Sequence, residues 1–233
     1  MNNSLTIIGA GAWGSALAIA LSHKFDKIFL LAKDKASSDA LGKKHSALSK
    51  PYNQNIFIDS SYEVINHSKA VLIATPSSAF GSVLKNIKDN LNDTPIAWVT
   101  KGFDPETANL LHETFNHYLT GHHPCVISGP TFAAEIVEEK PAAIVVASKD
   151  KKTRDYWSDI IQTETLRAYT NSDIVGVQVG GSVKNILAIA AGIASGLGFG
   201  ANTQAALITR GLAEMTRLGV ALGADKVTFQ GLS

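Results

Sequence analysis

The chain has 233 residues, 45% of them hydrophobic and 18% charged, and its formal net charge is +1 at pH 7. This composition is typical of a soluble globular protein and excludes a disordered or fibrous one. The near-zero charge provides no field that would attract nucleic acid or an anionic membrane, so neither is an expected partner. The single cysteine, Cys125, excludes an internal disulfide framework and favours a reducing, cytoplasmic compartment.

Two apolar segments need to be distinguished from targeting or membrane segments. Residues 5–22 follow no basic side chain and are interrupted by Gly9, Gly11 and Gly14, which a secretory signal helix does not require. Residues 186–201 fall short of the roughly 20 residues that span a bilayer. We therefore expect neither a signal peptide nor an integral membrane helix.

Strand and helix patterns alternate along the first part of the chain. Short apolar runs predict buried strands at residues 5–8, 28–31, 70–74, 96–99, 125–127 and 142–147. Residues 78–91 and 106–118 have apolar side chains at three- and four-residue spacings, as in helices that cover a sheet. The predicted fold class is α/β, with a Rossmann-type, doubly wound, mostly parallel sheet.

After Thr170 the pattern changes to helix rich in glycine and alanine, and residues 171–173 (Asn-Ser-Asp) are of the types that begin helices. We expect a dinucleotide-binding domain over residues 1–178, followed by the start of an all-α substrate domain over residues 179–233. Gly192, Gly196 and Gly200 recur every four residues, which predicts close helix packing rather than a membrane dimer.

A second helix is predicted over residues 203–222, and no third helical pattern follows before Ser233. The helical part is therefore expected to be too small to close a core of its own. Such an ending suggests truncation, proteolysis or a tightly bound partner. The sequence leaves the oligomeric state open, with a homodimer as one alternative.

A G-x-G-x-x-G motif, Gly9-Ala10-Gly11-Ala12-Trp13-Gly14, lies between the first predicted strand and a helical segment. In such a motif the first glycine permits a tight turn, the second lets the backbone approach a pyrophosphate, and the third lets helix and strand pack closely. The helix N-terminus offers unpaired N–H groups to the anion. With a strand on each side of the helix, this context favours a dinucleotide site over a merely glycine-rich turn.

The end of the second predicted strand indicates which nucleotide is bound. NAD enzymes commonly have an acid there for the ribose hydroxyls, whereas this chain has Lys33, followed by Asp34. A lysine can bind the 2′-phosphate of NADP, so NADP(H) is favoured and NAD(H) is the alternative, with Lys33 then solvated and Asp34 on the ribose. Trp13 either packs over the cofactor or belongs to the core.

Three segments, 74–77, 99–102 and 128–133, follow predicted strands at the carboxyl edge of the sheet, where open α/β folds bind ligands. Lys101 in the second segment suits a substrate oxygen or phosphate; the alternative is an ordinary surface lysine.

Lys184 is the only ionisable residue between Asp173 and Arg210. An isolated lysine in so apolar a segment is costly to bury, and burial or a second cation would lower its pKa towards neutrality. We therefore expect Lys184 to be a general acid or base, and the neighbouring Asn185 to orient the substrate; a packing role for both is the alternative.

The other candidate residues lack the neighbours that a metal site or a catalytic nucleophile needs. Four histidines lack the companion ligands that would specify a metal site, so no metal is expected: His112, His117, His122 and His123. Cys125 lies in an apolar strand with no obvious base, which favours buried packing over nucleophilic catalysis.

The motifs taken together resemble the bacterial NAD(P)-dependent glycerol-3-phosphate dehydrogenases over essentially the whole chain. The resemblance rests on segments 8–17, 100–102, 128–133, 181–185 and 206–215, which occur in the family's order. It implies a cytoplasmic enzyme of glycerophospholipid synthesis. Such an enzyme interconverts dihydroxyacetone phosphate and sn-glycerol 3-phosphate by hydride transfer with NAD(P)H.

The resemblance also implies roles for individual residues. Lys184 would accept a proton when glycerol 3-phosphate is oxidised and donate one when the ketone is reduced, and Lys101 would touch both cofactor and substrate. The resemblance assigns Ala12, Trp13, Lys33 and Ala133 to the cofactor, beside the motif glycines Gly9, Gly11 and Gly14. It assigns Gly129 and Thr131 to the substrate, which Asn185 is also expected to contact.

Family members continue beyond the Gly-Leu that matches residues 231–232, into segments that supply an acid partner for the lysine and a phosphate-binding arginine. The sequence therefore leads us to expect that residues 1–233 alone bind nucleotide but turn over slowly or not at all. Two other functions stay open: a related small hydroxy-acid reductase, and a non-catalytic nucleotide-binding fragment.

Overall fold

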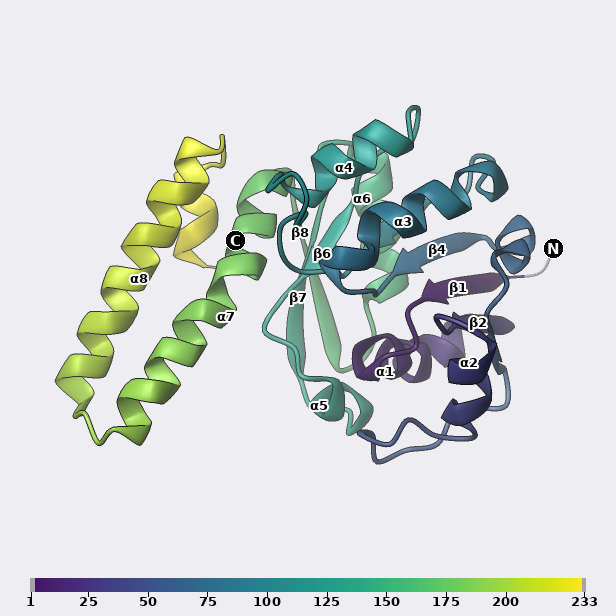
Figure 1. The fold of residues 1–233 in the computed structure, drawn as a ribbon, viewed down its shortest axis with the longest axis horizontal. Helices are drawn as coiled ribbons and strands as arrows, with labels where there is room; N and C mark the ends of the chain where they lie inside the picture. The colour runs from purple at the N-terminus through teal and green to yellow at the C-terminus, as the bar shows by residue number, and fades with distance from the viewer. Residues whose placement is uncertain (1–2, 232–233) are drawn as a thin grey trace.

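A computed structural model describes residues 3–231 as an eight-stranded sheet with helices on both faces and a helical pair that projects from one end (Figure 1). The strand order is β3-β2-β1-β4-β5-β6-β7-β8, and every neighbouring pair is parallel except β6 and β7. The strands are β1 (Ser4–Ile8), β2 (Lys27–Leu31), β3 (Ile56–Asp59), β4 (Ala70–Ile73), β5 (Ile96–Trp98), β6 (Val126–Ser128), β7 (Ala142–Ala147) and β8 (Leu166–Asn171). The predicted doubly wound, mostly parallel sheet is confirmed.

Eight α-helices connect or extend the strands within the described residues. They are α1 (Ala12–Leu21), α2 (Lys35–Leu41), α3 (Ser77–Ile87), α4 (Leu111–Tyr118), α5 (Ala133–Val137), α6 (Lys151–Ile161), α7 (Ile174–Gly196) and α8 (Ala201–Ala221). Short 3₁₀ segments occupy Ser22–Lys24, Tyr62–His67, Lys88–Asn90 and Lys226–Gln230.

Two apolar layers hold the sheet between helices, because side chains alternate between its faces along each strand. In β1, Ile7 packs in the layer covered by α1 and α6, whereas Ile8 packs in the layer covered by α3, α4 and the start of α7. In β4, Leu72 and Ile73 divide between the two layers in the same way. The sheet is thus buried on both faces, as a parallel sheet requires.

All six predicted strands are present, but the sequence analysis missed β3 and β8. Both are edge strands of the sheet and are only partly buried. Their sequences therefore mix apolar and polar residues instead of forming the continuous apolar runs of a central strand. Even the aromatic side chains of Phe57 in β3 and Tyr169 in β8 are exposed.

Helix α7 connects the sheet to the projecting pair (Figure 1). The predicted start signal is confirmed, because the Asp173 carboxylate accepts the N–H of Gly176 at 2.8 Å and caps the helix. The predicted domain boundary between residues 178 and 179 falls inside this continuous helix. The first two turns of α7 are buried against the sheet and the later turns are largely exposed, so two separate domains remain a prediction.

The predicted close packing at Gly192, Gly196 and Gly200 is wrong. A Cβ on any of the three would meet no atom within 4 Å, and Gly200 is the N-cap of α8 rather than part of α7. The helices approach instead at Gly211 of α8, where a Cβ would lie 2.3 Å from the Leu187 side chain. Spacing alone could not show which face of α7 meets α8.

The helical pair leaves much apolar surface exposed, as the sequence analysis expected for a part too small to close a core. The exposed large side chains include Ile186, Ile189, Ile193, Leu197, Ile208 and Leu212. By length and composition alone, α7 could cross a membrane, but 39% of its most apolar window is buried in the protein. A core helix of a soluble protein meets the same criterion. Leu232 and Ser233 lie outside the described residues.

The glycine turn after β1 is fixed by steric limits. Gly9 has a φ of +115°, which glycine adopts readily, and a Cβ there would lie 2.7 Å from the Ala74 carbonyl oxygen. At Gly14 a Cβ would lie 1.9 Å from the Gly9 carbonyl oxygen. Both positions therefore require glycine if α1 is to start this close to the sheet.

We predict that Gly14→Ala destabilises the protein by at least about 2 kcal/mol, because the added methyl group must displace the turn. Gly81→Ala on α3 is the matched control, since its Cβ would have only ordinary contacts at 3.7 Å. That control should be neutral or stabilising by up to about 1 kcal/mol, from improved helix propensity. Urea unfolding of both variants measures the difference, and equal stabilities would contradict the steric account.

Candidate active site

A large cleft lies at the carboxyl ends of β1, β2 and β4 and has a volume of about 890 Å³. β1 pairs with β2 on one side and with β4 on the other, so the strand order reverses at this point. Ligands of open α/β sheets bind at such switch points. The cleft walls include Gly9, Ala10, Gly11, Lys33, Ser37, Lys44, His45, Thr75 and Pro76.

The N-terminus of α1 opens towards this cleft and suits a pyrophosphate. Gly11 is the N-cap, and no side chain caps the helix, so the first N–H groups have no side-chain acceptor. A Cβ on Gly11 would meet no atom within 4 Å, in contrast to the crowded Gly9 and Gly14. This open space beside free backbone donors is what an anionic group needs in order to approach the chain.

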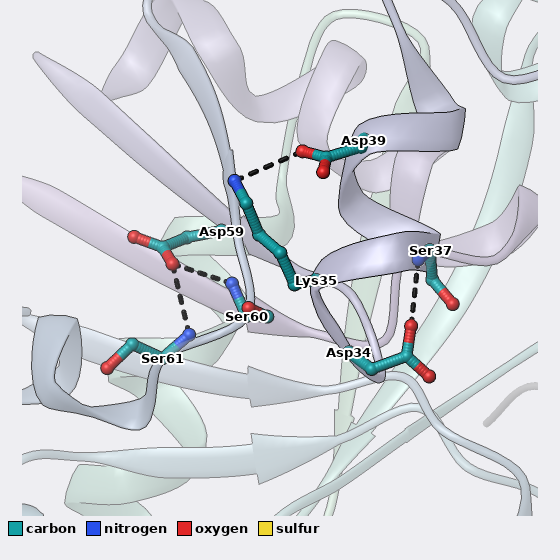
Figure 2. Close-up of polar contacts among 7 residues, drawn as sticks. All are labelled: Asp34, Lys35, Ser37, Asp39, Asp59, Ser60 and Ser61. Atoms are coloured by element: carbon teal, nitrogen blue, oxygen red, sulfur yellow. Dashed lines mark hydrogen bonds and ion pairs between the residues drawn. The ribbon is translucent and has the colours of Figure 1, made fainter.

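Two carboxylates near the ends of β2 and β3 accept backbone N–H groups (Figure 2). The Asp34 carboxylate accepts the N–H of Ser37 at 2.8 Å and caps α2, and this bond lowers the pKa of Asp34. The Asp59 carboxylate at the end of β3 accepts the N–H groups of Ser60 and Ser61 at 2.6 and 3.0 Å. Both carboxylates are thus engaged with backbone, while Lys33 lines the cleft.

Trp13 and Ala133 lie together on the other side of the glycine turn. Both pack against a small buried cluster of Ala16, Leu48 and Val137, and neither lines the large cleft. Trp13 also contacts the core layer that α1 covers. Core packing, one of the two alternatives for Trp13, is therefore present, and a cofactor role for either residue stays a prediction.

Lys101 and Lys184 meet at one backbone oxygen. Lys101 follows β5, Lys184 lies on α7, and their Nζ atoms donate to the carbonyl oxygen of Gly129 at 3.3 and 2.7 Å. The N–H of Thr131 donates to the same oxygen at 3.1 Å. Three residues named by the sequence analysis are thus brought together around Gly129.

This arrangement perturbs the charge of Lys184. Burial, followed by the neighbouring Lys101 cation, lowers the pKa of Lys184 from 10.5 to about 8. Burial also lowers the pKa of Lys101. A lysine with a pKa near 8 exists in both its neutral and charged forms near neutral pH, so it can take up or release a proton during a reaction.

Two buried hydroxyl oxygens near these groups have no hydrogen-bond partner in the described part of the chain, Thr75 Oγ1 and Thr131 Oγ1. An unpaired buried hydroxyl is costly, and a bound polar ligand would relieve that cost. Asn185, beside Lys184, is exposed, so no contact within residues 3–231 yet supports its expected role in orienting substrate.

The weaker candidates, Cys125 and the histidines, have the following surroundings. Cys125 is fully buried, and burial raises the pKa of its thiol, which opposes a nucleophilic role. Among residues 3–231, no cluster of three or more potential metal ligands is found. His112 instead contacts the Gln178 side chain, with its Nδ1 2.9 Å from the amide nitrogen.

Sequence reasoning missed two polar residues that connect the segments around these groups. Ser182 contacts both α7 and the turn after Lys101, and Gln178 connects α7 to α4. Both occur in an apolar helix, where a serine or glutamine gives no motif. Only the tertiary contacts distinguish them from ordinary helix residues.

Comparisons with known proteins agree over nearly the whole chain. The family models for the N-terminus and C-terminus of NAD-dependent glycerol-3-phosphate dehydrogenase match residues 4–154 and 173–233. The glycerol-3-phosphate dehydrogenase (NAD(P)+) of Vesicomyosocius okutanii subsp. Calyptogena okutanii is 56% identical over 234 residues, covering 100% of this chain and 72% of that protein. The Aliivibrio fischeri enzyme of the same name is 43% identical over 238 residues, covering 99% of this chain and 69% of that protein.

A solved structure shows the same fold. The crystal structure of glycerol-3-phosphate dehydrogenase from Coxiella burnetii aligns with a TM-score of 0.92 and 36% sequence identity. That alignment covers 99% of this chain and 73% of the other. The likeness therefore includes both the sheet and the projecting helices.

Proposed function

This chain belongs to the NAD-dependent glycerol-3-phosphate dehydrogenase family, and from that membership we propose how its own residues act on substrate and cofactor. The activity of the family is the NAD(P)-dependent interconversion of dihydroxyacetone phosphate and sn-glycerol 3-phosphate, which supplies glycerophospholipid synthesis. The observation that carries the proposal is the meeting of Lys101 and Lys184 at the Gly129 carbonyl oxygen.

Lys184 is the proton-transfer residue. When sn-glycerol 3-phosphate is oxidised, the neutral Lys184 amine takes the C2 hydroxyl proton, the C2–H bond breaks with loss of hydride, and the C2–O double bond forms. In reduction, the Lys184 ammonium returns the proton to the C2 oxygen. The nicotinamide, when bound, accepts or supplies the hydride. With a pKa of about 8, Lys184 favours reduction below that pH and oxidation above it.

Lys101 provides the electrostatic part of the mechanism. Its ammonium group lies beside that of Lys184, so it stabilises negative charge that develops on the C2 oxygen. It also adds to the effect of burial in lowering the Lys184 pKa, because a neighbouring cation disfavours the charged form of Lys184. The Gly129 carbonyl orients both groups, and the unpaired Thr131 hydroxyl is placed to bind a substrate oxygen.

For the cofactor, the family supports use of NAD or NADP, and we infer a preference for NADP(H). Asp34, just after β2, and Asp59, at the end of β3, are engaged with backbone N–H groups. Lys33, Lys44 and Ser37 line the cleft. Two cations and a hydroxyl suit the 2′-phosphate of NADP better than the free ribose of NAD.

We predict that the purified chain oxidises NADPH slowly, at a rate well below that of a full-length relative, and only when dihydroxyacetone phosphate is added. A simple 2-keto acid should not replace that substrate. Lys184→Met should lower the rate at least about 100-fold, because general acid–base catalysis contributes that much or more. Its NADPH affinity should stay within about twofold, since Lys184 lies outside the nucleotide cleft.

Absorbance assays of turnover and fluorescence titrations of NADPH measure the two effects separately. Undiminished turnover by Lys184→Met, or equal use of the 2-keto acid, would contradict the proposed function. NADPH binding without any turnover would favour a non-catalytic nucleotide-binding protein.

Lys33 and Lys35 give a matched test of cofactor preference. Lys33 lines the cleft, whereas Lys35 forms an exposed ion pair with Asp39 at 3.0 Å (Figure 2). We predict that Lys33→Ala weakens NADPH binding roughly fivefold to tenfold and leaves NADH binding nearly unchanged, because only NADPH carries the 2′-phosphate. Lys35→Ala should change neither. Calorimetric titration decides, and an equal loss for both nucleotides in Lys33→Ala would overturn the NADP preference.

A further inference from the structure

The turn after Lys101 is attached to α7 through one serine. The Ser182 hydroxyl accepts the N–H of Gly102 at 3.0 Å and donates to the Gln178 carbonyl oxygen at 2.7 Å. Ser182 lies two residues before Lys184 on the same helix. One hydroxyl group thus connects the residue after Lys101 to the helix that carries Lys184.

The Lys101–Gly102 turn has an unusual backbone conformation and close neighbours. Gly102 has a φ of +115°, and a Cβ there would lie 3.0 Å from the Ser77 Oγ at the start of α3. Just before the turn, the Thr100 hydroxyl donates to the Thr75 carbonyl oxygen, which follows β4, at 2.8 Å. The turn is therefore held against β4 and α3 on one side and by Ser182 on the other.

The side of α7 that contacts this turn is firmly placed. A Cβ on Gly181 would lie 2.4 Å from the Ser128 Oγ, so the helix backbone packs directly against the end of β6. The buried Gln178 side chain accepts the His112 N–H at 3.1 Å and donates to the Ile174 carbonyl at 2.9 Å. Through Ser182, the Lys101 turn is therefore attached to a part of α7 that is itself packed against the sheet.

We propose that Ser182 is a positioning residue: its hydroxyl group holds the Lys101–Gly102 turn against α7 and so sets the separation of the Lys101 and Lys184 ammonium groups at the Gly129 carbonyl. Ser182 itself touches neither ammonium group in the described contacts. This inference rests on the proposed dehydrogenase function, because it assigns a purpose to the spacing of the two lysines.

The substitution Ser182→Ala removes only the hydroxyl group. Lys101 then moves more freely, so its cation acts less on Lys184, and the Lys184 pKa rises from about 8 towards 10.5. Lys101 is the one charged group in the described residues that lowers the Lys184 pKa, and the nearby His112 contacts Gln178 rather than Lys184. NMR titration of lysines labelled at Cε measures this pKa without any turnover.

The kinetic effect is expected to be smaller than the loss of Lys184 itself. Loss of one neutral hydrogen bond should lower kcat/KM for dihydroxyacetone phosphate reduction roughly threefold to tenfold. The alkaline limb of the pH–rate profile should move to higher pH together with the Lys184 pKa. A serine with only a folding role would change stability and leave both pH-dependent readouts in place.

A matched control and a rescue variant complete the test. Thr216→Val on α8 removes a hydroxyl that likewise donates four residues back, to the Leu212 carbonyl at 2.8 Å, and should leave the Lys184 pKa unchanged. Ser182→Thr keeps the hydroxyl and should restore the wild-type pKa and rate. Ser182→Cys, with a weaker hydrogen-bonding group, replaces the alanine variant if that variant fails to fold, and should show a smaller shift in the same direction.

An unchanged Lys184 pKa in a folded Ser182→Ala or Ser182→Cys protein would overturn this inference, whether or not the protein turns over. A shifted pKa that Ser182→Thr does not restore would also overturn it, because the hydroxyl would then not be the cause. Failure of the proposed function is distinguishable, since it would appear as absent substrate turnover in the unsubstituted chain while the NMR comparison still decides the role of Ser182.

Discussion

The carbonyl oxygen of Gly129 accepts hydrogen bonds from two lysine ammonium groups, and the arrangement of the proposed active site depends on this contact. Burial, followed by the neighbouring Lys101 cation, disfavours the charged form of Lys184 and lowers its pKa to about 8, a pH range where it can transfer protons. The contact requires glycines, because a Cβ on Gly129 would lie 2.7 Å from the Ala143 carbonyl oxygen and one on Gly181 would meet Ser128. Close packing of α7 on the sheet and the chemistry of Lys184 therefore have the same structural cause.

The two halves of the site are connected through the order of the strands. β1 and β4 frame the nucleotide cleft, while β5 and β6, the next strands across the sheet, lead into Lys101 and Gly129. The parallel strands β1, β4, β5 and β6 place these turns along one edge, so groups far apart in the chain become neighbours. The Thr100 hydroxyl, bound to the Thr75 carbonyl, joins the cleft to the Lys101 turn. The residues proposed for cofactor and for substrate thus share one continuous edge.

Much of this arrangement could be predicted from the sequence. The glycine motif and the central strands were recognised because buried parallel strands are apolar throughout and the turn needs glycine at fixed positions. Lys184 stands out in the sequence because a lone lysine in an apolar helix is unusual, and its catalytic role is a proposal. The edge strands β3 and β8 were missed, since half-exposed strands lack that pattern. Ser182 was missed because its role depends on Gly102, 80 residues earlier, and a serine in a helix has no local signal for such a contact. The spacing of Gly192, Gly196 and Gly200 wrongly predicted close packing, because spacing does not show which face of a helix meets its neighbour.

The central claim is that Lys101 and Lys184 act on each other at the Gly129 carbonyl. It is tested most directly by NMR titration of Cε-labelled lysines in the unsubstituted chain and in Lys101→Met. Because the Lys101 cation helps to lower the Lys184 pKa, the account predicts one lysine that titrates near 8 in the unsubstituted chain, absent from Lys184→Met, and displaced towards 10.5 in Lys101→Met. A Lys184 that titrates at the ordinary lysine value, or one whose pKa is the same with and without the Lys101 charge, would contradict the account.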